Sequence, residues 1–517
     1  MMPQLGRFVF SLTALACLGV SLRPLGAQSL APNVSQVLMY SATTDQTVPI
    51  ASGNPIVLSR AVPNVFTESS VPTVLGGGNF VSAITNAANF RVAQSIVQIN
   101  SALNASIATA LSVIPLASPA SGVIVKTDAA GNSLPASSTL GSVFTERAET
   151  IGRHKVYLGF THQDYHFTSM NGKSLNGMSL LYTGGDPSNI TANGQTLKTL
   201  PTTFDLGMDV RLSQNIAILT YGVTDRFDIS LGLPLVHAAV ASRTFNGIIY
   251  AGDGLAGQTG TNCWCVDTFT PGSPSLTAPS IGQANRGKTG FGDTLLRFKA
   301  TVLEGPRAAV AVGTDIRFAT GDESNYLGSG TTSLKPFAAV SMYLRPLHNG
   351  VVIAPHFNVG WQFSGKSKLG GQLQGTNSSA SLPDGSTFAY VSAPFTSTKD
   401  YLPDVFSWAV GAEVALGTRS TVIADILGNQ LGWIHGIADT KTASVTGQYS
   451  PITPYPQQTV SGLISAGRTS YGQYSGAFGY KARIMGDLVF TLNALVRFDN
   501  NGLTARFAPL YGLGYTF

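Results

Sequence analysis

The chain has 517 residues, of which 57 are glycine and only 11% are charged, and its formal net charge is +5. Soluble globular proteins carry about 25% charged residues, so the composition argues against an ordinary soluble domain. So small a net charge gives no indication of a nucleic-acid partner. Beyond the N-terminal region, no stretch offers the roughly 20 apolar residues that a membrane-spanning helix needs.

Residues 1–27 have the features of an export signal. Arg7 supplies a positive charge, Phe8 to Leu22 is an apolar core, and Leu25-Gly26-Ala27 provides small residues before a cleavage point. The stretch Ala14-Leu15-Ala16-Cys17 loosely resembles a lipoprotein signal and leaves that alternative open.

Residues 28–149 form a separate N-terminal segment rich in Ser, Thr, Asn, Ala and Gly. Apolar residues at spacings of three and four predict an amphipathic helix at about residues 90–114, which Pro115 and Pro119 end. These apolar residues are Val92, Ile96, Ile99, Leu103, Ile107, Ala110 and Ile114. The opposite face is polar but not basic, so protein is a better partner for the helix than an anionic lipid surface. The segment is therefore a possible plug in the lumen of a barrel, or it docks at the periplasmic rim.

From residue 150 to 517 the sequence alternates between apolar and polar residues. In the clearest stretch, Leu206 and Met208 share a parity with Phe204, and Gly207 lies on the other, which predicts a strand with a lipid face and a lumen face. We count twelve such strands, with tight turns and longer loops mostly in alternation. This predicts an all-β fold, a transmembrane antiparallel up-and-down barrel in the outer membrane of a Gram-negative-type bacterium. A soluble β-sandwich is the alternative.

The final strand runs from Leu503 to Phe517 and ends on an aromatic residue. This resembles the signal that the barrel-assembly machinery reads, so we expect that machinery and outer-membrane lipid as partners.

The polar parity of the strands carries many charges. A charge on the lipid face costs about 2–4 kcal/mol for Arg or Lys at the midplane, so we expect these side chains to line the lumen. The predicted lumen-lining residues are Asp205, Asp209, Arg211, Asp228, Asp293, Arg297, Lys299, Asp315, Arg317, Lys335, His356, Glu413, Asp425, Lys481, Arg483, Arg497 and Arg506. Their signs are mixed, which favours pairing and bracing over an ion-selective ring.

Two smaller groups suggest other chemistry. His162, Asp164 and His166 alternate on the first strand with metal-ligand spacing, but they are only a weak metal candidate, because polar residues at the outer end of a strand explain them more simply. Cys263 and Cys265 lie in a long loop of an exported chain, where two thiols usually pair, so we predict a disulfide. We expect no cofactor.

Several stretches together resemble one family of bacterial outer-membrane barrels, labelled as belonging to the meta-pathway of phenol degradation. They are Thr145 to Thr150, Thr220 to Asp228, Gly290-Phe291-Gly292-Asp293, Ala319 to Glu323, Leu327-Gly328 and Lys335-Pro336. The resemblance covers about residues 95–517. It implies a transporter of hydrophobic or aromatic compounds and assigns no catalytic residues.

The sequence therefore favours a passive channel for small hydrophobic or aromatic solutes, and not an enzyme. A structural or surface-binding barrel with a closed lumen is one alternative, and an outer-membrane hydrolase is another. No Gly-x-Ser-x-Gly motif supports the hydrolase.

Overall fold

A computed structural model describes the following residues of the chain: 46–48, 56–58, 99, 101–115, 125–127, 133–135, 139–182, 190–192, 195–197, 202–250, 266–269, 283–344, 351–381, 387–417, 419–437, 441–445, 458–462 and 465–517. The predicted signal peptide and the Cys263–Cys265 disulfide lie outside these residues.

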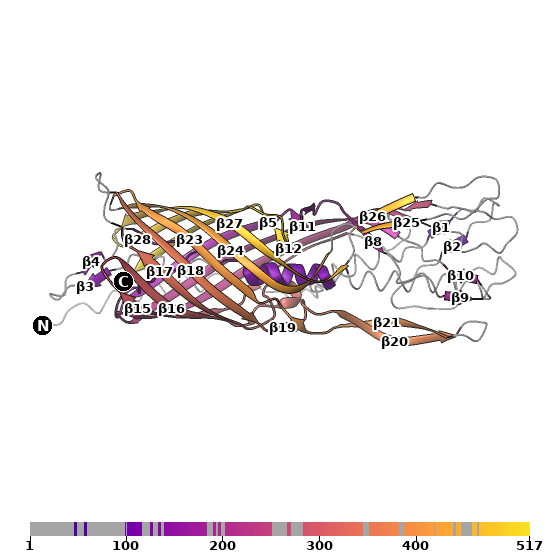
Figure 1. Cartoon of the computed structure of the whole chain (residues 1–517), viewed down its shortest axis with the longest axis horizontal. Coiled ribbons are helices and arrows are strands. Elements are labelled where there is room, and N and C mark those ends of the chain that lie inside the picture. Colours follow the sequence, from indigo (N-terminus) through magenta and orange to yellow (C-terminus); the bar gives the residue numbers. More distant parts are fainter. Residues whose placement is uncertain are drawn as a thin grey trace.

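Twelve antiparallel strands form a closed ring (Figure 1), and the predicted fold class is confirmed. In ring order the strands are β5 (Val156–Phe167), β11 (Thr202–Thr224), β12 (Phe227–Tyr250), β15 (Leu295–Glu304), β16 (Ala308–Arg317), β17 (Ser333–Met342), β18 (Val352–Ser364), β23 (Val405–Ala415), β24 (Ser420–Ile437), β27 (Ser465–Met485), β28 (Leu488–Arg497) and β30 (Phe507–Thr516). The pairing of β30 with β5 closes the ring. Closure leaves no unpaired strand edge in the lipid, where each free backbone group would cost several kcal/mol.

Shorter strands lie outside the ring. They are β1 (Gln46–Val48), β2 (Ile56–Leu58), β3 (Val125–Thr127), β4 (Ser133–Pro135), β6 (Ser169–Met170), β7 (Lys173–Ser174), β8 (Met178–Tyr182), β9 (Ile190–Ala192), β10 (Gln195–Leu197), β13 (Val266–Phe269), β14 (Gln283–Phe291), β19 (Lys366–Ser367), β20 (Leu373–Ser381), β21 (Thr387–Ser397), β22 (Asp400–Tyr401), β25 (Lys441–Val445), β26 (Gln458–Gly462) and β29 (Leu503–Thr504), and a 3-10 helix, η2, covers Glu323–Asn325.

The two ends of the barrel differ. At one end the strands join by tight turns such as those at Gly305 and Gly486, which is typical of the periplasmic side. At the other end β11 and β12 continue to 23 and 24 residues, although about 9–11 residues cross a bilayer. β12 runs through Pro234, and near it the partner of the strand changes from β15, paired as far as Gly232, to β14, paired from Leu235. β12 extends to Tyr250, and β14 pairs with its outer part.

The outer surface of the ring is apolar where it crosses the bilayer. Large side chains on this surface are 40–60% exposed, which is the arrangement that lipid requires. They include Phe160, Leu219, Leu233, Phe357, Val410, Ile426, Phe478, Leu492 and Leu513. Tyr221, Tyr511 and Tyr515 add aromatic rings to the same surface. The chain is therefore an integral protein of the outer membrane, as the sequence predicted.

The predicted faces of β11 are reversed in its outer part. Leu206 and Met208 point inward and are 0% and 4% exposed, whereas the side chains of Asp209 and Arg211 point outward and are 42% and 62% exposed. Asp205 shares the parity of Asp209 and Arg211. The physical reason is that this part of β11 stands beyond the membrane, so its outer face meets water and its apolar face packs against residues inside the barrel. Asp205, Asp209 and Arg211 are thus not lumen residues.

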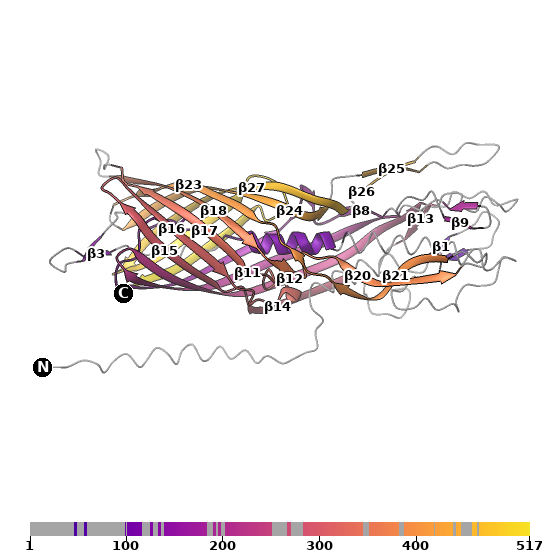
Figure 2. The same cartoon turned by 60° about the horizontal axis from the view of Figure 1, so that its bottom comes forward.

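One helix, residues 101–113, lies inside the barrel (Figures 1 and 2), and we call it the lumen helix. Its Leu103 and Ala108 are fully buried and belong to the same apolar cluster as Met208 of β11 and Ala508 of β30. The amphipathic period of the sequence thus corresponds to a real helix, with its apolar side against the barrel wall. Within the described part of the chain, no helix combines the length and apolarity that crossing a membrane requires.

Candidate functional site

The periplasmic half of the lumen holds residues 139–151, which we call the lower lumen segment. Its backbone is bonded to strands around the ring. Ile151 N donates to Asp228 Oδ2 of β12 at 3.0 Å, and Lys481 Nζ of β27 donates to Ser142 O at 2.7 Å. Between them, Ala148 N donates to Ser341 Oγ of β17 at 3.0 Å. Most of the segment is buried, so these bonds replace the water that its backbone would otherwise need.

A buried ion pair joins the segment to β23. Arg147 Nε donates to Glu413 Oε1 at 2.9 Å, and the second guanidinium nitrogen donates to Glu413 Oε2. Burial alone would lower the pKa of Arg147, but the carboxylates of Glu413 and Glu149 raise it above its ordinary value. The side chains are 4% and 1% exposed. The charge on each therefore depends on the other.

Glu146 of the segment links two basic strand residues. Lys299 Nζ donates to Glu146 Oε1 at 2.9 Å, and Arg297 donates to the other carboxylate oxygen. Arg297 also forms a two-bond pair with Asp315, at 2.6 and 2.7 Å. The backbone of Glu146 is bonded to the Asn358 side chain in both directions, at 2.6 and 2.7 Å. Glu146 is thus held by its charge and by its backbone.

A hydroxyl, a histidine and carboxylates meet at Thr145. Thr145 Oγ1 and Asp425 Oδ1 both lie 2.8 Å from His356 Nε2. The other ring nitrogen, Nδ1, is 3.8 Å from Glu413 Oε1, beyond hydrogen-bond distance. In a catalytic triad the hydroxyl and the carboxylate bind opposite nitrogens of the ring. Here they share one nitrogen, so the cluster positions Thr145 and does not activate it as a nucleophile.

In the outer half of the lumen, the lumen helix is hydrogen-bonded at its C-terminal end and at Asn104. Arg317 Nη1 of β16 donates to the carbonyl oxygens of Leu111 and Ser112 at 3.2 and 3.1 Å, where a helix has unsatisfied acceptors and partial negative charge. Tyr326 OH donates to Asn104 Oδ1 at 2.7 Å. Burial raises the pKa of Tyr326, so its phenol remains a donor.

The loop that carries Tyr326 is fixed by Asp293. This carboxylate accepts bonds from Ser329 N and Ser329 Oγ at 2.7 Å each and from Gly321 N at 3.1 Å. A side chain on Gly328 would collide with Asp293, because a Cβ there would lie 2.2 Å from Oδ1. Asp293 therefore braces the loop over the lumen helix.

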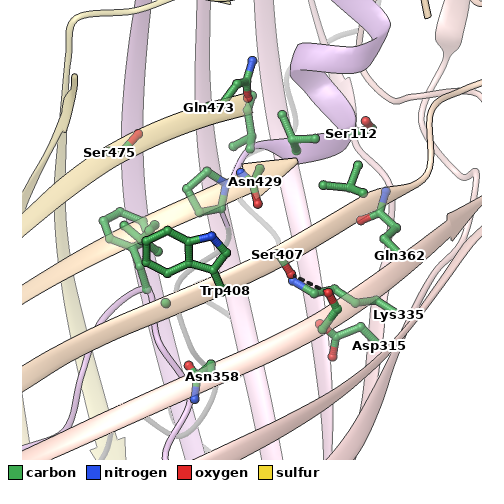
Figure 3. A pocket seen from close by; sticks show the side chains of 18 of the residues that line it. Ser112, Asp315, Lys335, Asn358, Gln362, Ser407, Trp408, Asn429, Gln473 and Ser475 are labelled. Carbon is green, nitrogen blue, oxygen red and sulfur yellow. Dashed lines mark hydrogen bonds between the residues drawn. The ribbon is translucent and has the colours of Figure 1, made fainter. Parts of the chain in front are cut away.

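A cavity of about 200 Å³ lies between the lumen helix and the lower lumen segment (Figure 3). Ser112 and Ile114 line it at the helix end, and Phe144 and Glu146 line it at the segment end. The ring contributes basic groups from β15, β16, β17 and β28 and amides from β18, β24 and β27. The polar lining residues of the ring include Arg297, Asp315, Arg317, Lys335, Asn358, Gln362, Ser407, Asn429, Gln473, Ser475 and Arg497. The apolar lining includes Tyr165, Phe167, Leu295, Phe337, Leu427 and Leu495.

The remaining predicted lumen residues have varied positions. Asp228 lies 3.9 Å from Lys299, and Arg497 pairs with Asp499 at 3.2 Å. Arg483 shares the inward parity of Lys481, and its Nε has no hydrogen-bond partner among the described residues. Arg506 precedes β30 at the exposed rim beside Asn500, so it is not part of the lumen cavity.

The weak metal candidate does not assemble. His162 Nε2 is 2.8 Å from Asp164, while His166 Nε2 is 3.1 Å from Asp209. These side chains lie on the outer face, as the ring contact of His162 with Tyr511 at 4.8 Å indicates. In the portion of the chain that the structure describes, no group of three His, Cys, Asp or Glu residues is arranged to bind a metal.

Sequence reasoning missed the residues of the lumen segments themselves. Glu146, Arg147 and Glu149 were noted only as part of a family-like stretch, although Glu146 and Arg147 form buried ion pairs with Arg297, Lys299 and Glu413. Their signal was available: three charges in six residues, within a segment that is otherwise nearly uncharged. Tyr326 had no signal, because its role depends on a loop that reaches the helix.

The ring, its apolar outer band and its filled lumen define a small outer-membrane barrel with an internal N-terminal segment. No family model and no curated protein matches the chain, so the meta-pathway resemblance stays a prediction. Among solved structures, the COG4313 outer membrane channel from Pseudomonas putida F1 is similar at 11% identity and a TM-score of 0.37, over 73% of this chain and 100% of that chain. A FadL homologue of Pseudomonas aeruginosa is similar at 11% identity and a TM-score of 0.27, over 70% and 90%. At these values neither likeness indicates what this chain carries.

Proposed function

We propose that the chain is a passive outer-membrane channel for small hydrophobic or aromatic solutes, gated by its own N-terminal segment. The observation that carries the proposal is the lumen cavity, which lies inside the barrel between two internal segments and has both apolar and polar walls. Ligand sites combine an apolar lining with a few placed polar groups. A solute moving through the lumen must pass this cavity.

The gate in this proposal has two parts of different strength. The lower lumen segment is fixed by buried ion pairs, whereas the lumen helix is held by a few hydrogen bonds and by apolar packing. We therefore assign the movable part to the helix. Its displacement breaks the Arg317 and Tyr326 contacts and leaves the ring intact.

Swelling of liposomes that contain the full chain tests the channel. The solutes form a series of graded size and polarity, from glycerol to benzyl alcohol and phenylethanol. We expect swelling that falls steeply with solute size and that favours aromatic over aliphatic solutes of equal size. No swelling by any solute, with the barrel shown to be folded, would contradict the channel.

One observation favours a second candidate, a structural barrel with a closed lumen. The ion pairs of Glu146 and Arg147 are buried, and breaking such pairs is costly. In that case the lumen segments brace the ring permanently, and the outer strands and loops bind a partner. Absence of conductance in planar bilayers, together with swelling data that show no uptake, would favour this candidate.

A further inference from the structure

We infer that the lumen cavity is a binding site for a small aromatic carboxylate. This inference deepens the proposed function, on which it rests, because it names the class of solute that the channel admits. It follows from three features of the cavity: basic side chains that form no direct ion pair, an adjacent apolar wall, and the available volume.

Two basic side chains at the cavity form no direct ion pair, and the carboxylate nearest to Lys335, Asp315, is already bonded to Arg297. Arg317 is bonded to two helix carbonyls, and among the described residues no carboxylate oxygen lies within the 4.0 Å of an ion pair from Arg317 or Lys335. In contrast, Arg297 is held by both Asp315 and Glu146. A cation removed from water without a partner is unfavourable, so a bound anion would stabilise this pair of residues.

The Lys335 side chain lines the cavity and lies across the neighbouring strand β18. A Cβ on Gly360 would lie 2.8 Å from Lys335 Cε, so the lysine stem crosses β18 at its glycine. Figure 3 shows Lys335 beside Ser407 of the next strand. Asp315 and Lys335 are paired in the register of β16 and β17, and Arg317 follows Asp315 on the same face. The two cations therefore lie on one side of the cavity.

Apolar side chains adjoin these cations. Leu295 is paired with Arg317 in the register of β15 and β16, and Phe337 follows Lys335 on the same face of β17. Ile114 lies at the helix end that Arg317 binds. A ligand with a carboxylate at one end and a flat ring at the other places its charge near Arg317 and Lys335 and its ring against Phe337 and Ile114. A neutral hydrocarbon would satisfy only the second half of this site.

The volume sets the size of the ligand. By the same measure one water needs roughly 10–15 Å³, so about 200 Å³ admits on the order of 13 to 20 non-hydrogen atoms. A single aromatic ring with a carboxylate fits within this limit.

Calorimetric titration of the full chain in detergent tests the inference. The probes are benzoate, benzyl alcohol and benzylamine, which share one ring and differ in charge. We expect benzoate to bind at least tenfold more tightly than benzyl alcohol, and benzylamine to bind most weakly. We expect Lys335→Met to weaken benzoate binding about tenfold, the size of one lost hydrogen bond to a charged group, and to leave benzyl alcohol binding unchanged. Lys335→Arg keeps the charge and should keep benzoate binding within about twofold.

Equal affinity of the wild-type protein for benzoate and benzyl alcohol would overturn the inference. So would benzoate binding that is indifferent to Lys335→Met. If that variant does not fold, Lys335→Gln replaces it, and the comparison of probes on the wild-type protein decides by itself. Binding without liposome uptake would refute the channel but leave the site, whereas uptake of neutral aromatic solutes without benzoate binding would refute the site but leave the channel.

Discussion

Glu413 and Arg147 come from distant parts of the chain and meet inside the barrel as a buried ion pair. A buried pair contributes little net stability compared with apolar residues, but breaking it leaves one charge uncompensated, at about 3–5 kcal/mol. The same logic applies to Glu146 with Lys299. The lower lumen segment is therefore held in one position by the cost of separating these charges.

Glu413→Gln should thus destabilise the protein by about 3–5 kcal/mol, because Arg147 remains buried without its carboxylate. Unfolding by guanidinium from lipid vesicles measures the change. The control is Asp322→Asn, which also removes one negative charge but at an exposed turn. It should change the free energy of unfolding by less than about 0.5 kcal/mol. A Glu413→Gln protein as stable as the control would show that the pair does not hold the segment.

On the outer face, Leu219 lies near the middle of the part of β11 that crosses the bilayer. Leu219→Arg should cost about 2–4 kcal/mol, since a cation there is placed in hydrocarbon. Ser213→Arg is the matched control, since it lies on the same face of the same strand but beyond the bilayer, and its cost should be near zero. The same unfolding assay compares them, and equal costs at both positions would refute the assignment of the membrane band.

At the level of elements, alternation along a strand revealed the two faces but not always which face met lipid. On β12 the apolar parity faces outward as predicted. On the outer part of β11 the apolar parity faces inward, because Leu206 and Met208 cover residues of the lumen and not lipid. A strand that leaves the membrane keeps its period of two, so the sequence alone cannot tell when its apolar side turns from a lipid surface into a core surface.

The loop of η2 depends on one carboxylate at the end of β14. Asp293→Ala should leave the backbone N–H groups of Gly321 and Ser329 unbonded and remove one bond of the Ser329 hydroxyl, and should therefore loosen residues 320–330. Hydrogen exchange of the folded protein in detergent should show at least tenfold faster exchange at Gly321 and Ser329. Asp322→Ala removes only an exposed cap of the 3-10 helix and should affect exchange at Ser324 alone. Unchanged exchange at Ser329 would show that Asp293 is not the brace.

At the scale of the whole molecule, the sequence predicted the number of strands, the closed barrel and its membrane. For most of the ring it also predicted which charged side chains point inward, because a charge on the lipid face is costly. It did not predict how those charges pair. Lys481 bonds to Leu140 O and Ser142 O, and these contacts span 341 and 339 residues of sequence, so no local pattern encodes them.

Deleting residues from Ala31 to Pro119 while keeping the signal should leave a barrel that assembles, because the ring contacts of residues 139–151 remain. We expect a higher single-channel conductance than that of the full chain, because the lumen helix no longer fills the outer half. Mobility on gels with and without boiling controls for folding. A folded deletion with unchanged conductance would assign the helix a role other than gating.

The lower lumen segment has a consequence for the order of folding. It precedes every strand of the ring in the chain, yet its partners extend from Asp228 on β12 to Lys481 on β27. Contacts of such high sequence separation form late and slow the folding of a protein. The segment therefore cannot complete its hydrogen bonds until the later strands of the ring are in place. It is synthesised before every strand of the ring, but its contacts with β27 form only after nearly all of the ring has been added.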